Sequence, residues 1–414
     1  MHFSRRTDWN TEENDLALAL RLRKQAGLPI ADLTASNPTL CEFTYPDSLL
    51  TALTDQRALA YDPQPKGLLP ARQAVCAYYA ARGITLDPAH ILLTTSTSEA
   101  YSFLFRLLCD PGDEILSLQP SYPLFDFLAA LDDISLKVAP LIYDHGWQID
   151  IEALRRALSP RTRAIVVVHP NNPTGHFTKP WEAAELAKLC REHQLALIVD
   201  EVFLDYAMNP GTSQPGVAPR PESGTWDSTD IVKPASFAAG LDGVPVFVVS
   251  GLSKIAALPQ MKVAWIVATG PNLKPALDRL EVIADTFLSM NAPIQYALPA
   301  WLTSASTLQQ QIQHRVAANL AELDRQLSCL PAVERLLFEG GWYAILRIPA
   351  LEPDEKTVLA LLERGVWIHP GYFFGMPPSG WLVVSLLAPT LEFGQGVTIL
   401  IDYFGKDQGS NATR

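Results

Sequence analysis

The sequence has few cysteines, no long apolar stretch and no run of basic residues. Its five cysteines lie far apart among 414 residues and form no C-x-x-C pair, so we expect reduced thiols and not a disulfide framework. No apolar run approaches the roughly 18 residues of a membrane-spanning helix, and the first residues carry no apolar signal segment. These absences predict a cytoplasmic protein without a membrane partner.

Positive charge is scarce as well. The 32 lysines and arginines are outnumbered by 44 aspartates and glutamates, and the formal net charge is -12. A phosphate backbone demands clustered positive charge, so we expect no nucleic-acid partner, although a pocket for a single phosphate group stays open. The eight histidines form no H-x-x-x-H pair, and neither G-x-G-x-x-G nor G-x-x-x-x-G-K occurs. We therefore expect no metal site and no dinucleotide fold.

Short apolar runs recur through the first two thirds of the chain, with helical patterns between several of them. The runs are continuous, which is typical of strands covered on both faces. We predict a three-layer α/β domain with a mainly parallel sheet of seven strands, at residues 91–95, 114–118, 135–141, 164–170, 195–201, 245–251 and 262–268. A long loop is expected between residues 207 and 242, and its Pro, Gly, Ser and Thr interrupt the alternation.

Both ends of the chain are expected to build a second, smaller unit. Residues 1–48 and 290–414 would form an α+β domain, and residues 49–289 the large α/β domain. In open α/β sheets, ligands gather at the carboxyl ends of the strands. Five polar or aromatic segments of the large domain follow predicted strands, so we expect them to share one site.

Lys254 and Asp200 have the most reactive side chains among these segments. Lys254 follows a strand in SGLSK, and desolvation can keep such a lysine uncharged, so that its amine forms a Schiff base. Asp200 ends an apolar strand in IVDEVF, where a carboxylate needs a cation or donor such as a pyridinium N–H. Taken alone, Lys254 also fits the simpler role of a surface lysine, and Asp200 that of a helix N-cap.

Hydroxyl, amide and aromatic side chains complete the predicted site. Ser96, Thr97 and Ser98 begin a helix in LLTTSTSEA, which suits a phosphate but equally an ordinary N-cap. Asn172 in HPNNPTG offers a donor and an acceptor, and Tyr122 in PSYP offers a ring for stacking, unless these are only a turn and a packed aromatic. Further phosphate contacts are expected from Ser250, Ser253 and Lys262. Together these groups suit a phosphorylated aromatic aldehyde.

The motifs NNPTG, DEVF and SGLSK resemble, in order and spacing, the fold-type I aminotransferases of classes I and II, which depend on pyridoxal 5′-phosphate. The resemblance extends from about residue 10 to residue 405. It implies an enzyme that moves an amino group from an amino acid to a 2-oxo acid through a Schiff base on Lys254. It also implies a homodimer with shared active sites and a large domain that binds the cofactor.

The resemblance implies a role for each residue of the site. Lys254 would also shuttle the proton at the substrate α-carbon, and Asp200 would pair with the pyridine nitrogen. Asn172 would donate to the phenolate oxygen of the cofactor, and Tyr122 would stack on its ring. The cofactor phosphate would be surrounded by Ser96, Thr97, Ser253 and Lys262, and by Tyr61 sent across the dimer interface.

Three positions depart from the family's usual pattern. Phe203 in DEVF stands where most relatives carry a tyrosine that donates to the phenolate oxygen. Lys262 replaces an arginine, which keeps the charge near the phosphate but loses the bidentate fork. Val383 stands where relatives place the arginine that clamps the substrate α-carboxylate. Another cation is needed there, unless the substrate differs.

Arg347 is the first candidate for that cation and Arg364 the second, although a solvent-facing role is the simpler interpretation of Arg347. Asn37, Tyr343 and His369 fall where relatives line the substrate pocket, and the aromatic residues around them predict an apolar pocket. For His369, a packing role fits equally well.

Two other functions stay open at this stage. The same fold and cofactor also support carbon–sulfur β-elimination and decarboxylation, and the missing arginine favours these reactions slightly. A non-enzymatic sensor that binds the cofactor is a weaker hypothesis, because the N-terminal extension is too short and too acidic for a DNA-binding module.

Overall fold

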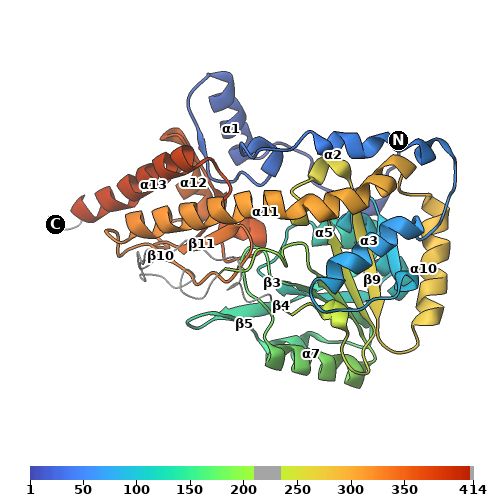
Figure 1. The fold of residues 1–414 in the computed structure, drawn as a ribbon. Coiled ribbons are helices and arrows are strands. Elements are labelled where there is room, and N and C mark those ends of the chain that lie inside the picture. The colour runs from blue at the N-terminus through green and yellow to red at the C-terminus, as the bar shows by residue number, and fades with distance from the viewer. Residues whose placement is uncertain (209–234, 411–414) are drawn as a thin grey trace.

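The computed structural model describes residues 1–208 and 235–410. Its larger part is a sheet of eight strands in the order β2-β9-β8-β7-β6-β3-β4-β5 (Figure 1). The strands are β2 (Ile91–Thr94), β3 (Glu114–Gln119), β4 (Ser135–Tyr143), β5 (Trp147–Ile149), β6 (Thr162–Val168), β7 (Ala196–Asp200), β8 (Val246–Gly251) and β9 (Ala264–Thr269). The predicted α/β fold is confirmed. The sheet has one strand more than expected, because the three residues of β5 are too few to show a periodicity.

The direction of the strands brings several carboxyl ends to one edge of the sheet. Strands β4, β3, β6, β7 and β8 pair in parallel, so they all run the same way. Strand β9 is antiparallel to both β8 and β2, which makes β2 run with β8. The segments that follow β2, β3, β6, β7 and β8 therefore leave the sheet at the same edge.

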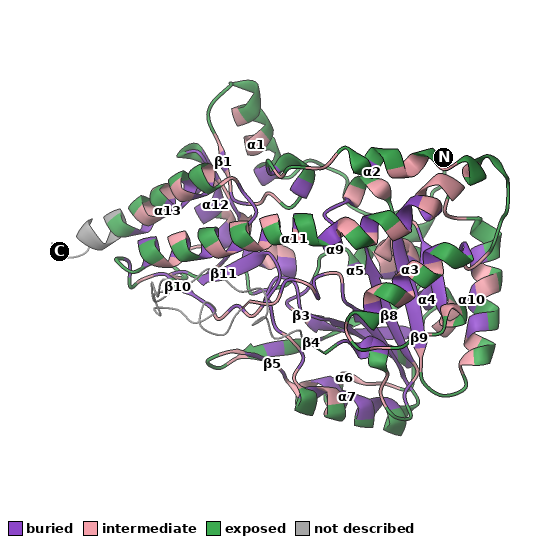
Figure 2. Cartoon of the chain, viewed as in Figure 1, coloured by how far each residue is buried: buried purple, intermediate pink, exposed green. Residues whose placement is uncertain are grey.

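Helices cover both faces of this sheet, and its central strands are buried throughout (Figure 2). Neighbouring residues of β8 belong to different apolar cores, Val248 to one and Val249 to the other, because successive side chains point to opposite faces. One core includes α3 (Leu69–Ala80), α6 (Ile151–Ala157) and α7 (Pro180–His193). The other includes α4 (Thr97–Leu108), α5 (Phe125–Leu131) and α10 (Leu273–Phe287).

The smaller part combines segments from both ends of the chain. A parallel pair joins β1 (Ala31–Asp32) to β12 (Val366–Trp367), and a second sheet has the order β10-β11-β14-β13. Its strands are β10 (Glu334–Arg335), β11 (Tyr343–Arg347), β13 (His369–Pro370) and β14 (Trp381–Ser385). The helices not named so far are α1 (Asp15–Gln25), α2 (Ser48–Thr51), α9 (Leu252–Ile255), α11 (Ala292–Leu327), α12 (Asp354–Glu363) and α13 (Thr390–Ser410). Of these, α9 belongs to the larger part.

Helix α11 runs along both parts of the molecule (Figure 1). The domain boundaries at residues 48/49 and 289/290 stay a prediction. Most of the loop expected between residues 207 and 242 lies outside the described residues. Within the described residues, no helix combines the length and apolar character needed to cross a membrane.

Short 3-10 helices connect many of these elements. They are η1 (Arg5–Thr7), η2 (Pro38–Leu40), η3 (Ala52–Thr54), η4 (Gln56–Leu59), η5 (Pro88–His90), η6 (Phe237–Ala239), η7 (Pro259–Met261) and η8 (Gly371–Phe374).

Candidate active site

Five of the predicted segments leave the sheet at its shared carboxyl edge. Ser96 follows β2, Tyr122 follows β3 and Asn172 follows β6. Asp200 is the last residue of β7, and Lys254 lies in α9 directly after β8. The topology thus brings together at one edge side chains that are up to 158 residues apart in the sequence, from Ser96 to Lys254.

Lys254 places its amine against aromatic rings. The residue is half-buried, and its Nζ lies 4.9 Å from the ring centroid of Trp342 and 5.7 Å from that of Phe203. Burial lowers the pKa of Lys254 to about 8, although the nearby Asp200 carboxylate acts in the opposite direction. At pH 7 the neutral, nucleophilic amine is therefore about 300 times more abundant than for a lysine of ordinary pKa.

Asp200 supplies a buried carboxylate with capacity for another donor. Its Oδ2 accepts a hydrogen bond from the Tyr101 hydroxyl at 3.0 Å, and its Oδ1 accepts one from the Val202 N–H at 3.0 Å. Burial raises the pKa of Asp200 to about 6, and these two hydrogen bonds and Lys254 oppose the rise. Each carboxylate oxygen can accept a second hydrogen bond, so a cationic N–H group is a fitting partner.

Several buried polar atoms at this edge lack hydrogen-bond partners among the described residues. They are Asn172 Oδ1, Ser250 Oγ and Ser121 Oγ, and the last precedes Tyr122. A buried polar atom without a partner is costly, so such atoms suit a polar ligand. Tyr122 leaves its ring half-exposed, and burial raises the pKa of its hydroxyl, with a smaller effect from Asp200. The two serine hydroxyls, which can donate, the amide oxygen of Asn172, which accepts, and the exposed ring fit pyridoxal phosphate.

The proposed phosphate end of the site lies at the start of α4. Ser96 is the N-cap, and its Oγ accepts a hydrogen bond from the Glu99 N–H at 3.1 Å, so the simpler N-cap role is real. Thr97 and Ser98 are the first two helical residues and remain half-buried. Other residues predicted for the phosphate are the half-buried Ser253, the exposed Lys262 and Tyr61, which is 82% exposed.

The predicted substrate residues take different positions. Tyr343 is buried in β11 opposite Ser385, and burial raises its pKa to about 12. His369 pairs with Val383 across β13 and β14, and burial lowers its pKa to about 4. Its Nδ1 is buried and has no hydrogen-bond partner in the described part of the chain. Asn37 is exposed and caps η2 by accepting from the Thr39 N–H at 3.1 Å.

Neither candidate arginine lies beside Val383. Strand β11 places Ile345 opposite Val383, and Arg347 lies two residues farther along, roughly 7 Å away. Arg347 is exposed, forms an ion pair with Glu334 at 3.5 Å and lies over the ring of Trp381. Arg364 lies over the ring of Tyr403 at 4.7 Å. The structure therefore favours the simpler, solvent-facing interpretation of Arg347.

Three residues near Lys254 and Asp200 had not been predicted. Tyr101 donates to Asp200, Trp342 packs against Lys254, and the Tyr206 hydroxyl donates to the Lys254 carbonyl oxygen at 2.6 Å. Each lies close to a segment that the sequence singles out: Tyr101 follows LLTTSTSEA, Trp342 precedes Tyr343, and Tyr206 lies three residues beyond DEVF. Aromatic residues next to such segments are the signal that could have identified them.

Comparisons with known proteins identify the family of the chain. The family model for aminotransferase class I and II matches residues 31–391. The glutamate–pyruvate aminotransferase AlaA of Escherichia coli is 27% identical over 382 residues, covering 89% of this chain and 88% of that protein. The aspartate/prephenate aminotransferase of Thermus thermophilus is 29% identical over 373 residues, covering 86% of this chain and 87% of that protein.

Solved structures show the same fold. An alanine aminotransferase from Pyrococcus furiosus superposes with a TM-score of 0.85 at 23% identity, and the match covers 98% of this chain and 100% of that protein. The match of the family model over residues 31–391 confirms the family predicted from the motifs. The chain belongs to the class I and II aminotransferases, and is an enzyme of amino-group transfer that depends on pyridoxal phosphate.

Proposed function

We propose that this aminotransferase moves an amino group from an amino acid to a 2-oxo acid, with Lys254 as the residue that carries the cofactor. One observation carries the proposal: a half-buried amine of lowered pKa lies close to a buried carboxylate that can accept a further donor. Relatives named for glutamate and pyruvate and for alanine support this substrate class.

Each side chain has a defined task in this proposal. When bound, the protonated pyridine ring of the cofactor withdraws electrons from the substrate α-carbon. Asp200 keeps the ring nitrogen protonated by pairing with its N–H, and Lys254 Nζ takes the α-proton and returns it. Asn172 donates to the phenolate oxygen and Tyr122 stacks on the ring. The phosphate is bound by Ser96, Thr97, Ser98, Ser250, Ser253 and Lys262.

The finer features of the proposal concern the pocket, the assembly and the compartment. Asn37, Tyr343 and His369 line the substrate pocket. The protein acts as a homodimer, in which the exposed Tyr61 reaches the partner's phosphate site. It works in the cytoplasm, in keeping with five cysteines that are all free.

A half-reaction experiment tests the proposed function. The cofactor-loaded enzyme is mixed with single amino acids and no acceptor, while the visible absorbance of the cofactor is followed. We expect one amino group to be taken up per site, and a 2-oxo acid to restore the original spectrum. Continuous release of ammonia and pyruvate without an acceptor would instead indicate β-elimination, and continuous release of carbon dioxide would indicate decarboxylation. An unchanged spectrum across the panel would favour a sensor.

The lowered pKa of Lys254 predicts how cofactor attachment depends on pH. Only the neutral amine attacks an aldehyde, so the rate of attachment to the apo-protein should rise with pH and level off above about 8. Stopped-flow absorbance after mixing with pyridoxal phosphate measures this rate. A rate that keeps rising tenfold per pH unit up to pH 10 would show a lysine of ordinary pKa.

Phe203 predicts an unusual titration of the bound cofactor. The side chain is buried, lies edge-on to Trp342 with a centroid separation of 5.2 Å and has no hydroxyl to donate to the phenolate oxygen. Installing one by Phe203→Tyr should lower the pKa of the proton shared by Lys254 and the cofactor by about one to two units, since a hydrogen bond to a charged group contributes roughly 1.5–3 kcal/mol. A pH titration of the visible absorbance measures it. An unchanged midpoint would mean that the new hydroxyl does not reach the cofactor.

A further inference from the structure

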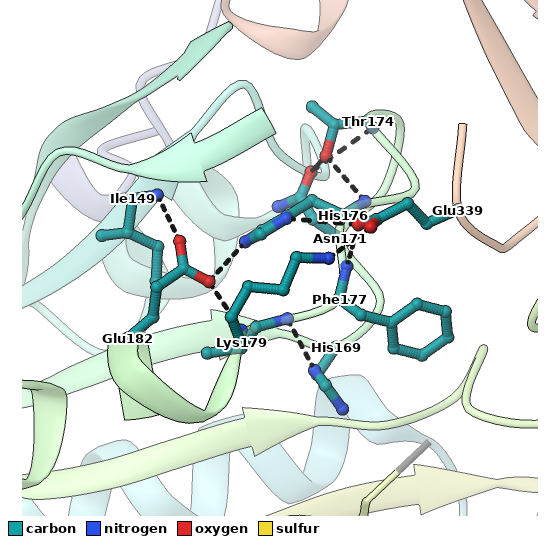
Figure 3. A network of polar contacts seen from close by, with 10 residues as sticks. Ile149, His169, Asn171, Thr174, His176, Phe177, Lys179, Glu182 and Glu339 are labelled. Carbon is teal, nitrogen blue, oxygen red and sulfur yellow. Dashed lines mark hydrogen bonds and ion pairs between the residues drawn. The ribbon is translucent and has the colours of Figure 1, made fainter. Parts of the chain in front are cut away.

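Four charged side chains gather beside the turn that carries Asn172. They are His176, Lys179, Glu182 and Glu339, and Figure 3 shows them together. The side chain of His176 is only 2% exposed and that of Glu182 is 0% exposed. The first three belong to the turn and to the start of α7, whereas Glu339 precedes β11 in the smaller part. The cluster therefore joins two segments more than 150 residues apart, from Glu182 to Glu339.

His176 lies between the two carboxylates. Its Nε2 is 2.9 Å from Glu182 Oε2, and its Nδ1 is 3.5 Å from Glu339 Oε2, an ion-pair separation. Glu182 also accepts the N–H groups of Ile149 at 2.7 Å and Lys179 at 2.6 Å. Glu339 accepts the Phe177 N–H at 3.1 Å and pairs with the Lys179 ammonium group.

The surroundings of His176 favour its positive form. Burial by itself lowers the pKa of His176, but the carboxylates of Glu182 and Glu339 outweigh burial and raise that pKa above its ordinary value. Burial would raise the pKa of Glu339, but His176, Lys179 and the Phe177 N–H lower it to about 2. The turn is therefore joined to Glu339 by ion pairs with His176 and Lys179, and the side chain of His176 is almost inaccessible to solvent.

The segment that follows Glu339 leads directly to Lys254. A Cβ on Gly340 would lie 2.6 Å from Phe177 Cε2 and 2.7 Å from the Tyr206 carbonyl oxygen, so this segment is packed tightly against the turn. Two residues later, the buried ring of Trp342 lies 4.9 Å from Lys254 Nζ. Only Gly340 and Gly341 separate Glu339 from the residue whose ring faces the amine.

We propose that His176 is a positioning residue, which holds Glu339 by charge and thereby fixes Trp342 against the Lys254 amine. The inference rests on the proposed role of Lys254 and adds a residue that touches neither cofactor nor substrate. It accounts for a buried histidine placed between two carboxylates, next to a turn that is also held by local hydrogen bonds such as that from Thr174 Oγ1 to Asn171 Oδ1 at 2.9 Å.

A double-mutant cycle tests the proposal on the full chain. His176→Asn, Trp342→Phe and the double variant are prepared as apo-proteins, and the dissociation constant of pyridoxal phosphate and its rate of attachment are measured. Each single change should weaken binding by roughly 10- to 100-fold, because small misplacements around a reactive group are costly. If His176 acts through Trp342, adding His176→Asn to Trp342→Phe should change binding less than threefold. Fully multiplicative effects would overturn the proposal.

Two further variants keep the test decisive. Glu339→Gln removes the pair with His176 from a less buried position, together with the pair between Glu339 and Lys179. It should reproduce both the loss and the coupling if His176→Asn does not fold. Glu114→Gln is the matched control: the side chain of Glu114 is also buried and charged, but it pairs with Arg161 at 2.8 Å at the start of β3, the far end of the strand from the site. Its effect should multiply with that of Trp342→Phe. A control that couples as strongly as His176→Asn would show general loosening of the fold.

The proposal and the proposed function fail in different ways. If the wild-type protein does not attach pyridoxal phosphate at Lys254, the proposed function fails. If attachment at Lys254 is normal and His176→Asn and Glu339→Gln leave it unchanged, only the positioning role fails.

Discussion

Lys254→Ala should reduce amino transfer by roughly 10⁴-fold or more, because it removes both the nucleophile that binds the cofactor and the base that moves the α-proton. The fold should survive, since α9 is held through the Lys254 backbone carbonyl, which accepts from the Tyr206 hydroxyl at 2.6 Å in either variant. Turnover with an amino acid and a 2-oxo acid, measured at saturating pyridoxal phosphate, gives the loss.

The matched control is Lys274→Ala. Lys274 is exposed and, among the residues that the structure describes, pairs only with Asp278 within its own helix, at 2.8 Å, so its removal should leave turnover within twofold. Undiminished turnover in Lys254→Ala would overturn the catalytic scheme as a whole. Equal losses in both variants would point to a general defect of the preparations.

Asp200→Asn should reduce turnover by roughly 10- to 100-fold. An amide cannot hold a positive charge on the pyridine nitrogen, and a charge-assisted hydrogen bond of this kind contributes roughly 1.5–3 kcal/mol. The substitution also replaces an acceptor of the Tyr101 hydroxyl, which lies 3.0 Å from Asp200 Oδ2. Steady-state kinetics and the dissociation constant of pyridoxal phosphate measure both consequences.

Glu201→Gln is the control that distinguishes a direct role of Asp200 in the reaction from the general effect of removing a buried carboxylate. Glu201 is the next residue and is fully buried, and burial raises its pKa to about 7, but it accepts from Ser236 Oγ and the Phe237 N–H. Its substitution should lower thermal stability and leave turnover within a few-fold. If Asp200→Asn lost no more activity than Glu201→Gln, Asp200 would have no direct part in the reaction.

The central strands of the fold were predictable because each is a continuous apolar run. All seven predicted strands form. Val, Ile and Leu buried on both faces give six of them a clear signal, whereas β4 is largely exposed and only two of its residues are buried. Strand β5 was missed because only the antiparallel pairing of Trp147–Ile149 with β4 defines it. The pairing of β1 with β12 was equally hidden, because two-residue strands from opposite ends of the chain have no periodicity.

The site was predictable where short motifs follow strands, and not where contacts join distant segments. Lys254, Asp200 and Asn172 lie at the same sheet edge, as the motifs indicated. The contact of Tyr101 with Asp200 spans 99 residues, and the approach of Lys179 to Glu339 spans 160. Such pairs depend on how helices and loops pack, which the local pattern of a sequence does not encode.

The position of Val383 shows a similar limit. The sequence indicates that a cation is missing there, but the register of β14 decides what stands beside it, namely Ile345 on one side and His369 on the other. Arg347 was the first candidate because it is a cation in a predicted strand of the smaller domain, yet the register of β11 and β14 pairs it with Trp381. Side-chain neighbours in a sheet follow from register, and a shift of one residue would change them all.

The attachment site of the cofactor tests the central claim most directly. The protein is incubated with pyridoxal phosphate, reduced with borohydride and digested, and the labelled peptide is identified by mass spectrometry. We predict one label per chain, on Lys254 of the SGLSK segment, and none in Lys254→Ala. A label on any other lysine, or no stoichiometric label, would contradict the account.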